Sequence, residues 1–450
     1  MNCLKTYSWR LTAFVGLLLM ASCKKDEPTI ESPTLDLADN SFIREWLDLS
    51  LTLSQQCNGF SEPITARSFR YLHFAMYESL VQGIPEMNSL QVKLDGFKVS
   101  LPQADPTLSY HWGLVANEAM AQLNKSFYES AGDYWVQEIF KLKDKHKLLY
   151  SKNLEPEMVL NSEKLGRAIA KSVWDFSLTD GRAYAYLNNY PKDFVYPTGP
   201  GLWIPTSPDY RPNPLLPTWS ETAPVLYKNL TDVRPTKLLK YSESSASLIY
   251  AEALEVYNLS SSIDADQKEE FNYFNKEMHV NAIPIAHIYR LALQISKDQQ
   301  LDVASTLKMM CSLSFGIHDG FVAAWNQKYT YHLCRVSSYI KQQIDKFYVP
   351  QMGSEPSPDF VSEEAMVYSI GGEVLSAYFG YRFPFMDHTQ SERTDLRAKS
   401  RSFNSFREFA KEAAFVDMHL GVHYRSSIEI GLEMGYDIAQ NVLKIDFNKK

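Results

Sequence analysis

Three short clusters in the second half of the chain hold the side chains best suited to chemistry. In the first, at residues 328–335, Lys328 and Arg335 stand seven positions apart. Seven residues make two turns of a helix, so the spacing predicts that both side chains point to one side. Two cations on one helix face repel each other, but they clamp an anion well because Arg supplies a planar fork and Lys a point charge. The cluster therefore indicates an anion site.

The second cluster, at residues 358–364, is a loop that leads into an apolar helix. Ser362 is the expected N-cap of that helix, and the free amides of a helix start attract anions. Glu363 and Glu364 follow it directly. Carboxylates in a first turn also stabilise a helix through its dipole, by roughly 0.3–1 kcal/mol, so this cluster has a purely structural explanation as well.

The third cluster, at residues 417–423, contains Asp417, Gly421 and His423. It is expected late in an amphipathic helix that begins with a capping box formed by Ser405 and Glu408. Gly421 would let another backbone or a ligand approach closely. The cluster adds a carboxylate and an imidazole to the side chains of the candidate site.

The order and spacing of the three clusters resemble the motifs of the vanadium-dependent haloperoxidases and their relatives, the type 2 phosphatidic acid phosphatases and bacterial class A acid phosphatases. Lys328, Arg335, Ser362, Gly421 and His423 match motif positions. Residues 197–206 and 319–328 are also similar to segments of long bacterial haloperoxidase-like proteins, and the resemblance spans roughly residues 60–445. It implies an all-α fold, a helical bundle of the haloperoxidase and acid phosphatase type.

The resemblance also implies roles for the matched residues. Lys328, Arg335 and Ser362 would bind the oxyanion, which is vanadate or phosphate. His423 would bond to vanadium or attack phosphorus. Glu364 stands where the family has its general-acid His, and vanadate is the cofactor that the resemblance suggests.

Several positions depart from the family pattern. Glu363 replaces a Gly, Glu364 replaces a His, and Asp417 replaces an Arg, while Val336 and Val416 stand for a Pro and a Ser. A carboxylate a few ångströms from an oxyanion costs on the order of 4 kcal/mol per unit charge pair at an effective dielectric constant of about 20. The substitutions therefore predict weak binding of phosphate or vanadate.

Two interpretations start from the oxyanion site of the family. In the first, Glu364 and Asp417 pair with Lys328 and Arg335 in a closed salt-bridge network, which gives an inactive relative. In the second, Glu364 has a raised pKa and acts as the general acid, while His423 remains a nucleophile or vanadium ligand.

A third interpretation replaces the oxyanion by a divalent metal ion. Carboxylates and imidazoles suit such ions, and Glu364, Asp417, His419 and His423 would be the ligands. His419 and His423 are four positions apart and would share a face of a helix. No Glu follows His419 directly, so the zincin pattern is absent.

The N-terminal stretch is typical of a bacterial lipoprotein precursor. Residues 1–22 combine a basic flank with an apolar run too short to span a bilayer, which predicts a cleaved signal peptide. Cys23 follows a lipobox-like sequence and is the expected lipidated residue, and residues 23–40 form a polar tether to the membrane. Residues 24–27 resemble the surface-export signal of some bacterial lipoproteins. The sequence predicts an outer-membrane lipoprotein of the cell envelope, facing either outward or into the periplasm.

Residues 41–450 are predicted to form one large helical domain, with a C-terminal core at about residues 240–446. A hydrophobic content of 45% allows a large core. The formal net charge of −8 is spread without blocks, which argues against nucleic acid as a partner. Beyond the lipid anchor, the expected partner is a small anionic substrate. Cys57, Cys311 and Cys334 allow at most one disulfide, and Cys334 is expected in the core.

Apolar residues recur at helical spacing through most of the chain. Helices are predicted at residues 68–82, 107–126, 134–147, 156–178, 242–257, 265–279, 283–296, 303–317 and 428–442. A junction between two helices is expected at Asp319 and Gly320. Gly431 and Gly435, one turn apart, indicate tight helix packing.

Two segments break the helical pattern. Residues 184–235 are crowded with prolines and aromatics, which predicts a long ordered loop packed down by side chains such as Trp203, Tyr210, Trp219 and Tyr227. Residues 383–400 are polar and are expected to form a rim loop.

Two classes of function follow. The first is an exported relative of the haloperoxidases and acid phosphatases with a degenerate oxyanion pocket, so that its activity is weakened, altered or lost. The second is a non-catalytic lipoprotein that binds a protein or a glycan, for which the aromatic residues of the long loop would be suitable.

Overall fold

The structure, a computed structural model, describes residues 36–276 and 283–449. The predicted signal peptide, Cys23 and most of the predicted tether lie outside the described residues. The described part is almost entirely helical, as predicted. Its α-helices are α1 (Ser41–Gln56), α2 (Glu62–Val81), α3 (Trp112–Phe127), α4 (Asp133–Tyr150), α5 (Pro156–Ser177), α6 (Tyr227–Thr231), α7 (Leu248–Ser261), α8 (Ala265–Asn272), α9 (Pro284–Asp298), α10 (Val303–Tyr331), α11 (Val336–Gln343), α12 (Glu363–Phe379), α13 (Phe406–Leu420) and α14 (Arg425–Val442).

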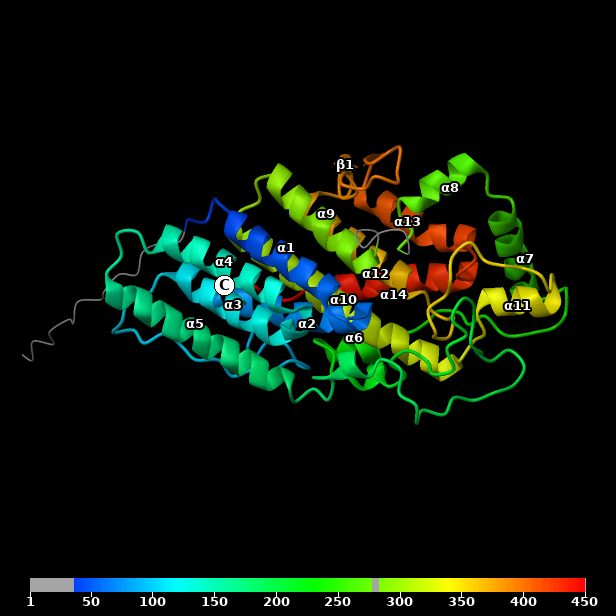
Figure 1. Cartoon of the computed structure of the whole chain (residues 1–450), viewed down its shortest axis with the longest axis horizontal. Helices are drawn as coiled ribbons and strands as arrows, with labels where there is room; N and C mark the ends of the chain where they lie inside the picture. Colours follow the sequence, from blue (N-terminus) through cyan, green and yellow to red (C-terminus); the bar gives the residue numbers. More distant parts are fainter. Residues whose placement is uncertain (1–35, 277–282, 450) are drawn as a thin grey trace, which may run out of the picture.

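The long helix α10 runs through the middle of the molecule and packs against α2, α12 and α14 (Figure 1). Its N-cap is Asp302, whose side chain accepts a hydrogen bond from the amide of Ser305. The junction predicted at Asp319 and Gly320 is wrong, because the helix continues through both residues. Asp319 is buried and accepts hydrogen bonds from the amides of Val225 and Leu226. Its carboxylate therefore fixes the two residues that directly precede α6.

Helices α1 to α5 lie together at one end of the molecule, while α7, α8, α11 and α13 lie at the other end (Figure 1). Helix α2 begins at Glu62, earlier than the predicted start at residue 68, because Pro63 suits the first turn of a helix. The C-terminal segment returns to the first end, where Asn88 N–H donates to Phe447 O at 2.8 Å and Lys449 N–H donates to Glu86 O at 2.8 Å.

Helices α12 and α14 are in close contact, and glycine makes that contact possible. A Cβ added at Gly431 would lie 2.5 Å from the carbonyl oxygen of Ser362, and one added at Gly435 would lie 2.6 Å from that of Met366. Both distances are too short for any side chain. The tight packing predicted from these two glycines is confirmed, and it places the start of α12 directly against α14.

The long loop at residues 184–235 is ordered but only partly packed as expected. Trp203 and Trp219 are buried, whereas Tyr210 and Tyr227 are at least half exposed. The loop is tied to the segment that follows α10 by backbone hydrogen bonds. Trp203 N–H donates to His332 O at 2.7 Å, and Cys334 N–H donates to Gly201 O at 2.9 Å.

The segment predicted as a polar rim loop contains a short antiparallel hairpin of β1 (Phe385–Asp387) and β2 (Arg401–Phe403). Phe385 and Phe403 are paired and buried, and they contact Phe406 and Phe409 at the start of α13. The hairpin therefore covers a core face.

Two further expectations concern cysteines and the membrane. Cys57, Cys311 and Cys334 are buried free thiols, and Cys334 belongs to the core as predicted. Among the described helices, none combines the length and apolar character needed to cross a membrane.

Candidate functional site

The two cations of the first cluster come from different elements. Lys328 lies in the last turn of α10, which ends at Tyr331, and His332 follows in the left-handed conformation. Arg335 is the N-cap of α11. The prediction of one continuous helix is wrong, yet Lys328 and Arg335 are both buried and face the same group of residues. The chain leaves the helical conformation between them, and backbone hydrogen bonds of His332 and Cys334 with the long loop hold this connecting segment in place.

Arg335 is held mainly by uncharged partners. Its Nε donates to Ser357 O at 2.7 Å, and its Nη2 donates to Ser357 Oγ at 2.8 Å and to Glu355 O at 3.2 Å. Its Nη1 lies 3.2 Å from His423 Nε2. Within the described part of the chain, no carboxylate forms a direct ion pair with this guanidinium group.

Lys328 is paired with a carboxylate. Its Nζ donates to the carbonyl oxygens of Pro358 and Asp359 and lies 2.7 Å from Glu363 Oε2. Both members of the ion pair are buried, with side chains 0% and 3% exposed. Glu363, the residue that replaces a family Gly, thus neutralises Lys328.

Ser362 is the N-cap of α12, as predicted, and its Oγ accepts a hydrogen bond from Ala365 N at 3.1 Å. The next carboxylate, Glu364, points to a different cation. Its Oε1 lies 2.6 Å from Lys276 Nζ, and its Oε2 lies 3.3 Å from His423 Nε2. Burial alone would raise the pKa of Glu364, but the charge of Lys276 and the hydrogen bond with His423 hold it well below its usual value.

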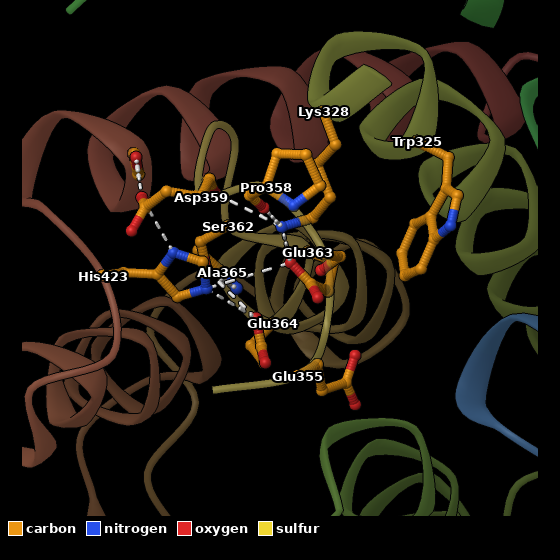
Figure 2. A network of polar contacts seen from close by, with 12 residues as sticks. Trp325, Lys328, Glu355, Pro358, Asp359, Ser362, Glu363, Glu364, Ala365 and His423 are labelled. Atoms are coloured by element: carbon orange, nitrogen blue, oxygen red, sulfur yellow. Dashed lines mark hydrogen bonds and ion pairs between the residues drawn. The ribbon is translucent and has the colours of Figure 1, made fainter. Parts of the chain in front are cut away.

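His423 lies between two carboxylates (Figure 2). Its Nδ1 is 3.1 Å from Asp359 Oδ1, and that carboxylate also accepts from Ser427 Oγ at 2.6 Å. Burial lowers the pKa of His423, but the charge of Asp359 and the hydrogen bonds with Asp359 and Glu364 outweigh it and raise the pKa to about 9. The imidazole is therefore cationic at neutral pH. It lies beyond the end of α13 and not within a helix.

Asp417 does not form the predicted pair with Arg335. It is 7% exposed, and its Oδ2 has no hydrogen-bond partner among the described residues. Burial, together with the nearby charge of Glu364, raises its pKa to about 7. The first interpretation thus has the right kind of network but the wrong members, because Glu363 neutralises Lys328 and Glu364 neutralises Lys276.

His419 is not part of the group. It lies in the last turn of α13 and stacks on Phe271 with ring centroids 4.3 Å apart. Helix α13 ends at Leu420, and Gly421 takes a positive φ of 81°, so His419 and His423 do not share a helix face. The ligand set of the third interpretation is therefore wrong. The residues that the structure does bring together with metal-ligand spacing are Glu363, Glu364 and His423, whose ligand atoms lie within 4.8 Å of one another.

Gly421 is closely approached by another segment of the chain, because an added Cβ would lie 3.2 Å from the backbone Cα of Pro350. A Cβ there would contact the hydroxyl group of Tyr348 and the ring of Pro350. The capping box expected at the start of α13 is only half formed. Ser405 Oγ accepts from Glu408 N at 3.1 Å, while the carboxylate of Glu408 bonds Asn404 instead of the N-cap amide.

The arrangement does not fit vanadate. An oxyanion needs unpaired cations and free donors, but the Glu363 carboxylate contacts Lys328 and the Glu364 carboxylate faces His423 Nε2. Asp417 adds a third buried acidic group where the family has an Arg. Anion repulsion from these groups outweighs the attraction of Arg335, the one matched cation without a carboxylate partner in the described chain.

Sequence reasoning missed three contributors. Asp359 lies three positions before Ser362, and its place in the second cluster could have marked it. Ser357, which binds Arg335, lies just before that cluster. Lys276 follows α8 with no motif around it, so nothing in the sequence indicated its contact with Glu364.

Comparisons with known proteins agree with this fold. The model of a family described as the VCPO second helical-bundle domain matches residues 345–447. A bacterial vanadium-dependent iodoperoxidase structure is similar, with a TM-score of 0.79 and 28% identity, and the match covers 90% of this chain and 97% of that one.

Two bacterial vanadium-dependent chloroperoxidase structures share the fold at lower identity. The holo form has a TM-score of 0.68 and 12% identity over 91% of this chain and 98% of its own. The apo form has a TM-score of 0.61 and 11% identity over 85% of this chain and 95% of its own. No curated protein matches the sequence. The resemblance noted from the sequence is confirmed: the chain is similar to the bacterial vanadium haloperoxidases and has the helical fold of the haloperoxidase and phosphatidic acid phosphatase superfamily.

Proposed function

We propose that this protein is an exported lipoprotein, anchored through Cys23 to the bacterial outer membrane, that has kept the haloperoxidase fold but lost the oxyanion chemistry of its superfamily. In this proposal the protein neither oxidises halides with vanadate nor hydrolyses phosphate esters. It faces outward or into the periplasm, where it acts as a binding protein and not as a haloperoxidase or phosphatase.

The observation that carries the proposal is the ion pair of Lys328 with Glu363, 2.7 Å long and almost completely buried. Glu364, next along the chain, is bound by Lys276 and faces His423. The protein thus supplies its own anions to the groups that would otherwise bind an oxyanion. A repulsion on the order of 4 kcal/mol per charge pair corresponds to about a thousandfold loss of affinity.

The interpretation with altered catalysis has less support. A general acid needs a raised pKa, whereas the pKa of Glu364 is lowered. A nucleophilic imidazole must be neutral, whereas the pKa of His423 is raised to about 9. The lowered pKa of Glu364 and the raised pKa of His423 therefore both oppose the catalytic roles that this interpretation assigns to them.

The test is titration of the purified protein with orthovanadate and with phosphate by calorimetry. We expect no saturable binding at millimolar concentration, and no iodide or bromide oxidation with peroxide and vanadate. The triple variant Glu363→Gly, Glu364→His and Asp417→Arg restores the family residues at the three positions where this chain has a carboxylate instead, so we expect it to gain vanadate affinity.

The His423→Ala substitution in the triple variant is the control, since it should remove the gained binding. Val416→Ser also moves the sequence toward the family pattern but changes no charge, so alone it should leave vanadate binding absent. Saturable vanadate binding by the unmodified protein that disappears with His423→Ala would overturn the proposal.

A further inference from the structure

The neutralised site contains more acidic groups than cations. Within the described chain six carboxyl groups lie among three fixed cations, Lys276, Lys328 and Arg335, and the imidazolium group of His423, so the carboxyl groups are in excess by two. These groups belong to Glu62, Glu355, Asp359, Glu363, Glu364 and Asp417. Buried charge without compensation is strongly unfavourable, so this excess favours the uptake of a cation.

Three oxygen atoms in this group have no hydrogen-bond partner among the described residues, and one of them, Glu363 Oε2, has the charge of Lys328 beside it. Glu363 is 2% exposed, and its Oε1 has no partner, while its Oε2 contacts Lys328. Asp417 is 7% exposed, and its Oδ2 is likewise unpartnered. An unpartnered buried oxygen costs about 1–3 kcal/mol, more when it is charged, and a bound ligand would remove that cost.

His423 Nε2 also has conflicting neighbours. The donor Arg335 Nη1 lies 3.2 Å away and the acceptor Glu364 Oε2 lies 3.3 Å away. One ring nitrogen either donates or accepts, so protein contacts satisfy only one of these neighbours. A metal ion that displaces the proton from Nε2 to solvent can bind both Nε2 and Glu364, and the short distance between these two atoms then becomes an edge of its coordination shell.

The spacing suits a small divalent ion. Ligand atoms 2.0–2.2 Å from a tetrahedral ion lie roughly 3.3–3.6 Å apart. His423 Nε2 is 3.3 Å from Glu364 Oε2 and 3.9 Å from Glu363 Oε2. On the other side of the ring, Nδ1 is 3.1 Å from Asp359 Oδ1, which is the carboxylate–histidine arrangement that orients metal-ligating imidazoles.

We propose that Glu363, Glu364 and His423 bind a divalent first-row transition-metal ion, with Asp359 as the residue that orients His423. Two carboxylates and one imidazole suit Mn²⁺ or Zn²⁺. Glu363 offers a carboxylate oxygen to the ion and keeps its ion pair with Lys328, and Lys276 stays beside Glu364. The inference rests on the proposed loss of the oxyanion site, because the same carboxylates exclude an oxyanion.

The experiment is titration of the chelator-treated, purified protein with MnCl₂ and with ZnCl₂ by calorimetry, with the bound metal measured by mass spectrometry. We expect one ion per chain. The Glu363→Gln variant should weaken binding at least tenfold, and Asp359→Asn should weaken it about 10- to 100-fold.

Glu373→Gln is the matched control. Glu373 lies on the same helix, α12, is buried and pairs with Arg407, but it is not one of the proposed ligands. We expect its metal affinity to equal that of the unmodified protein. Circular dichroism checks that each variant is folded.

Pulsed electron paramagnetic resonance on the Mn²⁺-loaded unmodified protein gives a readout that needs no variant. A nitrogen coupling from one coordinated imidazole is expected. The inference is overturned if neither ion binds saturably, if the nitrogen coupling is absent, or if folded Glu363→Gln binds as the unmodified protein does. If the protein binds neither metal nor vanadate, the metal site is disproved and the proposed function stands. If it binds vanadate, the proposed function is disproved.

Discussion

At the scale of single residues, the site depends on which of two neighbouring glutamates meets which lysine. Successive residues on a helix point about 100° apart, so Glu363 and Glu364 at the start of α12 face different directions. Glu363 meets Lys328 and Glu364 meets Lys276. The motif comparison located both glutamates and the matched cations in advance. It could not assign the pairs, because Lys276 comes from a distant segment with no recognisable pattern.

The buried pair leads to a prediction about stability. Lys328→Met removes the partner of Glu363 and leaves a buried carboxylate, so we expect a loss of about 3–5 kcal/mol in the free energy of unfolding. The double variant with Glu363→Gln should recover much of that loss. Urea unfolding followed by fluorescence measures both.

A surface pair provides the comparison for that measurement. Lys171 and Asp175 are both largely exposed, so Lys171→Met should change stability by less than about 1 kcal/mol. If Lys328→Met proved as mild as this, the Lys328–Glu363 pair would not be the buried interaction described above.

At the scale of helices, the sequence predicted most elements but misplaced several ends and missed α1. The periodic pattern identified α5 and α14 closely, because proline, glycine and apolar spacing mark them. The end of α10 was missed because His332, which takes the left-handed conformation, is neither Gly nor Asn. The tertiary contact with the long loop stabilises that conformation, and such contacts leave no local signal.

The close contact of α12 and α14 gives a second prediction. Gly435→Ala would favour α14 by about 1 kcal/mol from helix propensity alone. We expect the opposite, a lower melting temperature, because the new Cβ meets the carbonyl oxygen of Met366 at 2.6 Å. Asp437→Ala, at an exposed position of the same helix, is the control and should be nearly neutral. An equal or higher melting temperature for Gly435→Ala would mean that the two helices separate easily.

At the scale of the whole molecule, buried histidines make the fold sensitive to acid. His73 lies between α2 and α10 and donates from Nδ1 to Met310 O at 3.1 Å, and burial lowers its pKa to about 3. Burial also lowers the pKa of His146 and His318. Protonation is therefore easier in the unfolded chain than in the folded protein.

The sign of the pH dependence follows from that difference. Because the folded pKa of His73 lies below the ordinary value of 6.5, its contribution is fully present above pH 6.5 and is lost as the pH falls toward 3. For His73 alone we expect about 2 kcal/mol less stability at pH 5 than at pH 7. His73→Gln keeps a donor but does not titrate, so its unfolding midpoint should change less with pH. The same replacement at the exposed His388 should leave the change of the unfolding midpoint with pH as it is in the unmodified protein.

The hydrogen bonds that join Trp203 to His332 and Cys334 to Gly201 have one more consequence. They join the long loop to the short segment that separates Lys328 from Arg335. Local opening of either segment would break the same bonds, so the loop and this connecting segment belong to one cooperative unit of the native state. A change in loop length or composition around Gly201 would thus alter the positions of Lys328 and Arg335, although neither residue itself is changed.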